Sequence, residues 1–458
     1  MKDDIDWNSK VMSAPFPFIE KVKKKSVIEA RGQYAGINLW AVQPQHLFPK
    51  CSQFVCNLMR LEVYQYNMAA VPIDSPERST EVLDKISVAD FFNVHLTTAV
   101  SPELFLNAFP DHQPVGGVPK SSPYLTDIDN YQPWKRNINH FLNTLLLSES
   151  NFNLCTLMKD FHFPGFLTGS WYCKVVWSFF RSHIEQLFAP SLNVCYLGGT
   201  TWWCIMRADL EKYKQFLIQY VKEEFGMDQD RKWSDQQSRL LLALLYAKKT
   251  FIDPRLLVAA GIKVFQLDQK AGDVVMLDGD IVHLGVCSER ESINEAINFI
   301  PVSWLVHGLP LLKDWIEWLK GFMMDEQVLK EGYGVDWAQV KGVVFNDKVK
   351  MLVGKHCPRE FTETFLRNVK RSIGQQRPLV VTREEEKRED DSSSRKRKRP
   401  HHTAQAEVQS EPPLSAIDYS ELSDDELKKA ISHIDKIVNF LNQQEVKDWY
   451  ENSCPDDR

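Results

Sequence analysis

The alternation of apolar and polar positions predicts a β-rich region in the middle of the chain. Between Gly169 and Met206, the short runs SWYCKVVWSFF, SLNVCYL and TTWWCIM are rich in β-branched and aromatic residues and predict strands. GDVVML and IVHLGVC predict two more strands around a DGD turn, and INFIPVSWL predicts another. Apolar residues at three- and four-residue intervals predict helices in DLEKYKQFLIQYVKEEF, between the strands, and over residues 310 to 374.

The residues before this region show mixed patterns. FIEKVKKKSVIEA predicts a helix, whereas GINLWAV, a short apolar run after a glycine, predicts a strand. Residues 76 to 135 are rich in Pro, Ser and Gly and predict an irregular connector with one helix candidate, Val88 to Phe92. The spacing of apolar residues from Arg136 to Asp160 is again typical of helix.

The end of the chain combines a polar stretch with an amphipathic one. Residues 383 to 414 contain EEEKREDDSSS and then RKRKRP, a composition that cannot bury enough surface to fold. Ser423 to Tyr450 predict one helix, with Ser423 and Glu426 as a capping box. The helix either packs on its own domain or binds a partner helix through an apolar stripe of Leu427, Ile431, Ile434, Val438 and Leu441.

Composition limits the classes of protein to which the chain can belong. A chain of 458 residues with 43% hydrophobic and 25% charged residues predicts two or three folded regions. The formal net charge of -6 requires any nucleic-acid affinity to come from a local patch. Nine cysteines without a CxxC pair do not indicate a zinc ribbon or a disulfide framework. No run approaches 18 apolar residues and the N-terminus has no apolar stretch, so we expect neither a membrane span nor a secretory signal.

The triplet His183-Ile184-Glu185 is the candidate for metal chemistry. Residues i and i+2 of a strand point to the same side, so the imidazole and the carboxylate converge. His283, in the later run IVHLGV, is the candidate for a third ligand. Two histidines and one carboxylate with open positions suit non-haem Fe(II). A surface histidine near a glutamate is the alternative interpretation of the triplet alone.

Several segments in order resemble the JmjC domain over roughly residues 150 to 305. GSWYCKVVWSFFRSHIEQ resembles the strands that carry the family's tyrosine, here Tyr172, and its first two metal ligands. LNVCYLGGTTWWCIM resembles the next strand pair, LLVAAGIKVFQLDQKAGDVVMLDGDIVHLGV the strands up to the final histidine, and INEAINFIPVSW the closing strand with Asn298. APFPFIEKV and GINLWAVQP more weakly resemble a degenerate JmjN segment.

The resemblance implies a β-rich α+β fold, a cupin-like double-stranded β-helix with flanking helices. It divides the chain into a JmjN-like segment at residues 1–75, a connector at 76–135, the barrel with a helical insert at 136–305, a helical region at 306–380, a disordered basic linker at 381–414 and the C-terminal helix at 415–458.

The resemblance also implies an activity and the residues that carry it. His183, Glu185 and His283 would bind Fe(II), and Tyr172, Thr200, Thr201 and Asn298 would contact 2-oxoglutarate. Such a dioxygenase hydroxylates an N-methyl group of a histone lysine, and the product collapses to formaldehyde. The implied partner is a histone tail or another chromatin protein, and the implied location is the nucleus. The run Arg395 to Arg399 supports nuclear import or a nucleic-acid contact, although a solvated charge run is the alternative.

The chain departs from the family pattern where 2-oxoglutarate binds. Thr200 or Thr201 stands at the position of the lysine that commonly holds the distal carboxylate, Cys195 at an asparagine and Ala296 at a serine. The family's zinc-binding Cys and His have no evident counterparts. Losing one partner of a buried charge pair costs about 2 to 5 kcal/mol. Lys174, on a nearby strand but outside the family position, is a candidate replacement.

Three hypotheses follow from these departures. The intact triad favours a 2-oxoglutarate-dependent dioxygenase of the histone demethylase type. The missing lysine favours a catalytically weak or inactive JmjC-fold adaptor that recruits chromatin partners. A hydroxylase of a protein or RNA substrate is the third.

Overall fold

The structure is a computed structural model that describes part of the chain. The described residues are 28–34, 37–42, 62–69, 81–87, 89, 102–107, 121–129, 153–158, 161–224 without 162, 164 and 177, 251–287, 289–323, 359–376 and 417–453. Side chains of residues 28–87 and of some helix ends lie outside this description. The basic linker at 381–414, with Arg395 to Arg399, also lies outside it.

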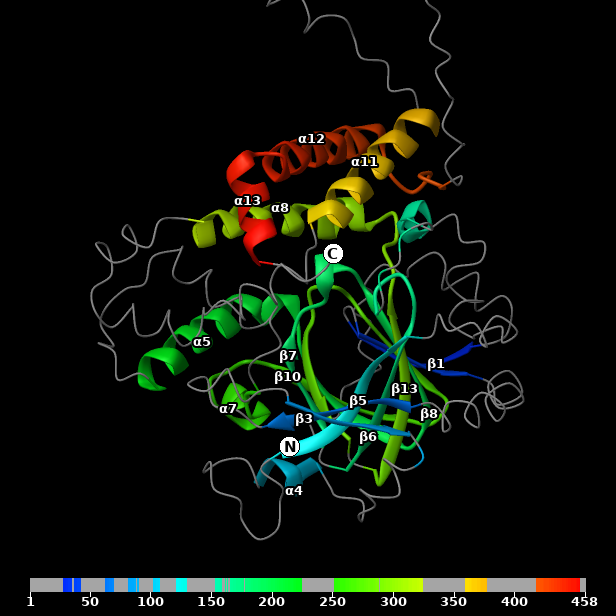
Figure 1. Ribbon diagram of the computed structural model, residues 1–458, viewed down its shortest axis with the longest axis vertical. Coiled ribbons are helices and arrows are strands. Elements are labelled where there is room, and N and C mark those ends of the chain that lie inside the picture. Colours follow the sequence, from blue (N-terminus) through cyan, green and yellow to red (C-terminus); the bar gives the residue numbers. More distant parts are fainter. Residues whose placement is uncertain are drawn as a thin grey trace, which may run out of the picture.

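Two antiparallel sheets form the barrel of the central region (Figure 1). The larger sheet contains its strands in the order β1-β2-β11-β8-β13-β6-β5-β3-β4, and the smaller sheet in the order β10-β9-β12-β7. The barrel strands are β6 Ser170–Val175, β7 Phe179–His183, β8 Ser191–Leu197, β9 Gly199–Ile205, β10 Val264–Lys270, β11 Asp273–Leu277, β12 Val282–Val286 and β13 Glu291–Asn298. Apart from β9 and β10, which are neighbours in the smaller sheet, successive strands of the barrel alternate between the two sheets. This arrangement confirms the β-rich, cupin-like barrel that the sequence predicts.

Strand β9 shows how the barrel is filled. All seven of its residues are buried, because one face lies between the sheets and the other lies under helices. Trp202 and Cys204 pack inside the barrel against Phe265 of β10 and Leu277 of β11. Trp203 points the other way and joins the larger apolar cluster that includes the helices. Alternate side chains of β9 therefore point into the barrel, and those between them point to the face that the helices cover.

The N-terminal residues extend the larger sheet at both ends. The strands concerned are β1 Ile28–Tyr34, β2 Ile37–Val42, β3 Glu62–Ala69, β4 Glu81–Ser87 and β5 Ser121–Asp129. β2 pairs with β11, and β5 pairs with β6. The strand predicted in GINLWAV is confirmed as β2.

Two predictions for the N-terminal residues are wrong. Ile28–Tyr34 is a strand, so the last three residues of FIEKVKKKSVIEA are not helical, and the rest of that run lies outside the described residues. The connector contributes β4 and β5 to the sheet. β1 pairs with β2, which in turn pairs with β11, and β4 and β5 both pair with β3, so strand pairing outweighs the local sequence pattern in both places. Of the helix candidate Val88 to Phe92, the structure describes residue 89 alone.

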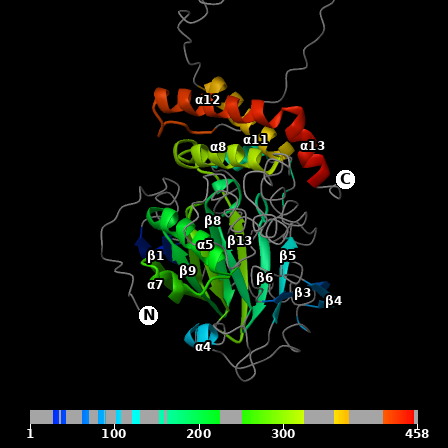
Figure 2. The same cartoon turned by 90° about the vertical axis from the view of Figure 1, so that its left-hand side faces the viewer.

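Short helices connect the strands, and long helices form a layer over one end of the barrel (Figure 2). The short elements are α4 Pro102–Asn107, η4 Leu154–Met158, η5 Gln186–Phe188, η6 Arg207–Asp209 and α7 Pro254–Ala259. The long helices are α5 Leu210–Glu224, α8 Trp304–Met323, α11 Arg359–Gln376, α12 Asp424–Leu441 and α13 Gln444–Ser453, of which α8, α11, α12 and α13 make the layer. Of the helix predicted from Arg136 to Asp160, the structure describes residues 153–158, in which Leu154–Met158 form the 3-10 helix η4.

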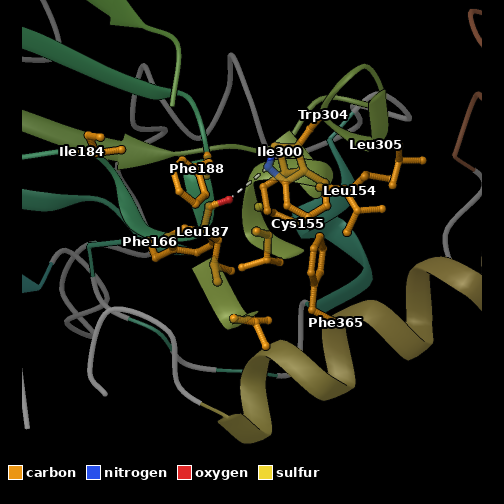
Figure 3. Packing of buried hydrophobic residues seen from close by; sticks show 14 of the residues in the cluster. Leu154, Cys155, Phe166, Ile184, Leu187, Phe188, Ile300, Trp304, Leu305 and Phe365 are labelled. Atoms are coloured by element: carbon orange, nitrogen blue, oxygen red, sulfur yellow. Dashed lines mark hydrogen bonds between the residues drawn. The ribbon is translucent and has the colours of Figure 1, made fainter. Parts of the chain in front are cut away.

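The contact between barrel and helical layer centres on Trp304 (Figure 3). Its Nε1–H donates a hydrogen bond of 3.1 Å to the Leu187 carbonyl in η5. Its ring lies 5.8 Å from the ring of Phe365 in α11, measured between centroids. The apolar run INFIPVSWL predicts strand to its end, but β13 ends at Asn298 and α8 begins at Trp304. The turn between them lets the closing strand lead directly into the layer.

The C-terminal helix is two helices. The capping box of Ser423 and Glu426 is present as predicted, and α12 ends at Leu441, where Asn442 caps it and donates from Nδ2 to the Val438 carbonyl. The apolar stripe packs on α8 and α11 of the same chain, with Leu427 and Ile434 fully buried. Of the two alternatives for this stripe, the structure shows packing on the chain's own domain.

No helix among the described residues is long and apolar enough to cross a membrane.

Candidate metal centre

Three side chains from two neighbouring strands meet inside the barrel. His183 ends β7, and in the β7–β12 pairing it lies opposite His283 of β12. Glu185 follows two residues after His183, and the three candidate ligand atoms lie within 4.8 Å of one another. Glu185 Oε1 is 3.4 Å from His283 Nε2 and 4.0 Å from His183 Nε2. The three residues that the sequence singles out thus come together in one place.

Backbone carbonyls fix which ring nitrogen of each histidine faces the centre. His183 Nδ1 lies 2.6 Å from the Arg181 carbonyl, and His283 Nδ1 lies 2.9 Å from the Ile281 carbonyl. A carbonyl oxygen can only accept, so each Nδ1 carries the hydrogen. In the neutral rings, both Nε2 atoms therefore present lone pairs toward Glu185. Histidines that bind metals are oriented by this kind of contact.

The donor set fits a divalent cation. Two nitrogen lone pairs and a carboxylate converge in a region where both histidines are buried, which is unfavourable without positive charge between them. Ligand atoms at about 2.1 Å from one ion lie roughly 3 Å apart, so the distances of 3.4 and 4.0 Å leave room for one ion. Two histidines and one carboxylate on one side, with other positions open, suit Fe(II).

The backbone after Glu185 is strained, and its neighbours hold it. Glu185 is extended, with φ -70° and ψ 154°, so its side chain continues on the same side as His183. Leu187 and Phe188 both have positive φ, 54° and 52°, a conformation that costs energy in residues other than glycine. Trp304 holds the Leu187 carbonyl, and Asn298 Nδ2 donates to Glu185 Oε2 at 3.2 Å. These contacts orient the carboxylate toward the histidines.

A bulge in β7 places an aromatic ring beside the triad. Phe180 pairs with Gly285 and His183 with His283, so two residues of β7 oppose Leu284 alone. Phe180 and His183 consequently share the inner face although they are three residues apart. The Phe180 ring lies 6.1 Å from the His183 ring and 6.3 Å from the His283 ring. Any Cβ at Gly285 would overlap this ring, so the position requires glycine.

Trp202 completes the apolar wall. Its ring centroid lies 5.9 Å from that of His283 and 4.8 Å from that of Phe180. Its Nε1–H donates to Gln269 Oε1 at 3.1 Å, so the buried indole is satisfied inside the protein. The centre is therefore walled by two aromatic rings that limit access of water.

The structure separates the two threonines that the sequence could not distinguish. Thr200 is buried on the inner face, where its Oγ1 accepts a 2.7 Å hydrogen bond from Lys174 Nζ. Thr201 points to the other face and donates to Asp268 on β10. Of the remaining expected 2-oxoglutarate contacts, Tyr172 lies opposite Asn294 in the β6–β13 pairing, and Asn298 contacts Glu185.

An amide network inside the barrel escaped the sequence reasoning. Asn193 Oδ1 accepts from Asn294 Nδ2 at 2.8 Å and from Gln269 Nε2 at 3.2 Å. Asn193 lies two residues before Cys195, on the same side of β8, so an amide is present near the position where the sequence comparison finds cysteine. Polar residues at alternate positions of the buried strand β13, Ser292 and Asn294, are the sequence signal that could have revealed it.

Comparison with known families agrees with this geometry. Residues 170–299 match the family model described as "JmjC domain, hydroxylase". Residues 170–299 form a JmjC domain. The match begins at the first residue of β6 and ends one residue after β13, so it comprises all eight barrel strands and the three candidate ligands.

The curated relatives are lysine-specific demethylases at low identity. "Lysine-specific demethylase ELF6" of Arabidopsis thaliana is 25% identical over 186 residues, which are 41% of this chain and 13% of that protein. "Lysine-specific demethylase rbr-2" of Caenorhabditis briggsae is 24% identical over 176 residues, 38% of this chain and 10% of the relative. Human "Lysine-specific demethylase 5D" is 26% identical over 138 residues, 30% of this chain and 8% of the relative. The chain therefore spans only about a tenth of the length of these relatives.

Proposed function

We propose that the chain is an Fe(II)- and 2-oxoglutarate-dependent dioxygenase that removes methyl groups from histone lysines. The observation that carries the proposal is the triad, in which both Nε2 lone pairs face the Glu185 carboxylate inside the JmjC domain. The names of the relatives support lysine demethylation as the reaction class.

Each residue of the centre has a defined part in this proposal. His183, Glu185 and His283 would hold the metal, and the Arg181 and Ile281 carbonyls keep the histidines in the required tautomer. Asn298 orients the carboxylate. Fe(II) together with a 2-oxo acid supplies the activation of dioxygen when both are bound. Phe180 and Trp202 exclude water from the reacting region.

Anaerobic titration tests the metal and cosubstrate parts. The purified protein should bind Fe(II), and addition of 2-oxoglutarate should produce the metal-to-ligand charge-transfer absorption of a chelated 2-oxo acid. His283→Ala should abolish both signals, whereas His307→Ala, on the exposed side of α8, should change neither. A wild-type protein that binds no Fe(II) would overturn the proposal.

Methylated peptides test the substrate part. The Fe(II)-loaded protein with 2-oxoglutarate and oxygen should convert an N-methylated histone-tail lysine peptide to its less methylated form and release formaldehyde in equal amount. Mass spectrometry of the peptide and a formaldehyde assay measure both products. Turnover of 2-oxoglutarate that leaves every methylated peptide unchanged would favour a hydroxylase with another substrate.

A chromatin adaptor without catalysis is the second candidate. Threonine at the position of the family's lysine is the observation that favours it. The two candidates differ in the same titration, because an adaptor would bind metal without producing the charge-transfer absorption. Specific binding of histone-tail peptides by such a protein would then support the adaptor.

We also propose that the protein acts in the nucleus, that residues 1–75 are a JmjN-like segment and that Arg395 to Arg399 direct nuclear import. A fluorescent fusion with these five positions changed to alanine should move from the nucleus to the cytoplasm. Nuclear retention of the changed fusion would remove the import role. A gel-shift assay of the unchanged protein tests the alternative nucleic-acid contact of this run.

A further inference from the structure

Lys174 is a buried lysine that spans the barrel. It is the penultimate residue of β6 in the larger sheet, with 6% of its surface exposed. Its Nζ donates to Thr200 Oγ1, in the smaller sheet, over 2.7 Å. The same Nζ lies 5.8 Å from the centroid of the Phe180 ring, whose other neighbours include the two histidines of the triad. The ammonium group is therefore one aromatic ring away from the metal centre.

The charge of Lys174 has no anionic partner among the residues that the structure describes. Its only close polar contact there is the neutral Thr200 hydroxyl. The thiols of Cys173, Cys195 and Cys287 lie near it. Burial raises the pKa of all three, that of Cys195 to about 11 and that of Cys287 to about 12, so all three thiols are neutral at pH 7. Burial also lowers the pKa of the Lys174 ammonium. An interior ammonium with one neutral hydrogen bond is unfavourable until an anion joins it.

The residue opposite Lys174 in the neighbouring strand is also polar. Ser292 lies opposite Lys174 in the β6–β13 pairing, and its hydroxyl donates to Asn294 Oδ1 at 2.6 Å. Thr200 is one of the two residues that could stand at the position of the family's lysine. Lys174 contacts it from a different strand. The Lys174 amine thus lies within hydrogen-bond distance of a residue at a candidate family position, which itself holds a hydroxyl.

We propose that Lys174, positioned by Thr200, binds the distal carboxylate of a 2-oxo dicarboxylic acid. The 2-oxo acid group at the other end of this molecule would bind at the metal centre. The inference rests on the proposed dioxygenase function and names the residue that replaces the missing lysine. It predicts that the protein selects a five-carbon dicarboxylic 2-oxo acid over its monocarboxylic analogue. The selection arises because only the dicarboxylic acid neutralises the buried ammonium.

Calorimetric titration of the anaerobic Fe(II)-loaded protein with two acids tests the inference. The probes are 2-oxoglutarate and 2-oxopentanoate, which has the same chain length but no distal carboxylate. The wild type should bind 2-oxoglutarate at least about 30-fold more tightly, as expected for a buried charge pair. Lys174→Met should bind both acids with equal, weak affinity. Lys270→Met, which removes an exposed lysine of the same barrel from β10, should keep the wild-type preference.

Two results would overturn the inference while the proposed function stands. One is a wild type that binds both acids equally, and the other is a Lys174→Met protein that retains the wild-type preference. A wild type that binds Fe(II) but neither acid is a different result, which overturns the proposed function and this inference together.

Thr200→Val provides a second variant in case Lys174→Met does not fold. It preserves the shape of the side chain but removes the hydroxyl that positions the ammonium. The affinity for 2-oxoglutarate should fall by about 3- to 10-fold, while the affinity for 2-oxopentanoate stays unchanged. Equal loss for both acids, or no loss for either, would contradict the role of Thr200 and Lys174 in holding the distal carboxylate.

The stability of the ligand-free protein separates a binding role from a structural one. Lys174→Met removes an uncompensated interior charge, so its melting temperature should equal or exceed that of the wild type. A structural lysine would show a lower melting temperature together with an unchanged preference between the acids, and that pair of results would end the proposal.

Discussion

The barrel interior and the helical layer are both buried, but they bury different chemistry. The layer is almost entirely apolar: among the described residues of its four long helices, only Thr362 and Ser372 are buried and polar. The barrel interior instead holds Lys174, His183 and His283 together with a network of amides. Buried polar groups cost stability unless they are paired. The layer therefore stabilises the fold, and the barrel interior retains the polar groups to which we assign ligand binding.

The largest expected effect is a loss of Fe(II) binding in a protein that still folds. His283→Ala removes a metal ligand, so Fe(II) affinity should fall by more than the roughly 100-fold that loss of an outer contact causes. The melting temperature of the ligand-free protein should stay near the wild-type value, because the buried imidazole faces the other donors. Fe(II) titration and thermal unfolding measure the two quantities. Unchanged Fe(II) affinity would contradict the assignment of His283.

The reverse change weakens the layer and spares the centre. Phe365 is fully buried between Trp304 and Phe361, so Phe365→Ala should lower the free energy of unfolding. The expected loss is about 3 to 5 kcal/mol. Denaturant unfolding measures it, and Fe(II) affinity under native conditions should match the wild type. A large loss of Fe(II) affinity in the folded variant would show that the layer and the centre are coupled through Trp304 and Leu187.

An outer contact of the centre should have an intermediate effect. Asn298 donates to Glu185 Oε2, so Asn298→Ala leaves the carboxylate less well oriented. Fe(II) affinity should fall by about 10- to 100-fold. Gln215→Ala, which removes an exposed amide of α5, is the matched control. Equal Fe(II) affinities for the two variants would show that Asn298 does not orient the ligand.

The last expected effect is confined to a window of pH and concerns the turn before the strand of His283. Burial raises the pKa of Asp278 from 3.8 to about 6, and nearby Arg207 partly opposes this. Between these values the folded protein retains a proton that the unfolded chain has released, so stability should fall as the pH rises from 3.8 to 6. Asp278→Asn should remove this fall, which is at most about 3 kcal/mol at about 1.4 kcal/mol per pKa unit. Unfolding curves at several pH values measure the change in stability. Asp314→Asn, at an exposed position of α8, is the control.

Much of the centre follows from local patterns in the sequence. Strand periodicity placed His183 and Glu185 on one side, and the order of the later runs indicated His283 and the JmjC barrel, because ligand type and strand alternation are local properties. The capping box at Ser423 is local in the same way, and the structure contains it. Turns between apolar runs were harder to locate, so SWYCKVVWSFF, predicted as one strand, is β6 followed by β7.

Tertiary structure decided what depends on partners far along the chain. The pairing of β2 with β11 and of β5 with β6 turned the N-terminal residues into sheet. The bulge in β7 set which residues face inward, and the register of β9 put Thr200 inside and Thr201 outside. Lys174 meets Thr200 only because the two sheets close into a barrel. Periodicity along one strand gives the face of a residue, but contacts across a barrel require the positions of both sheets.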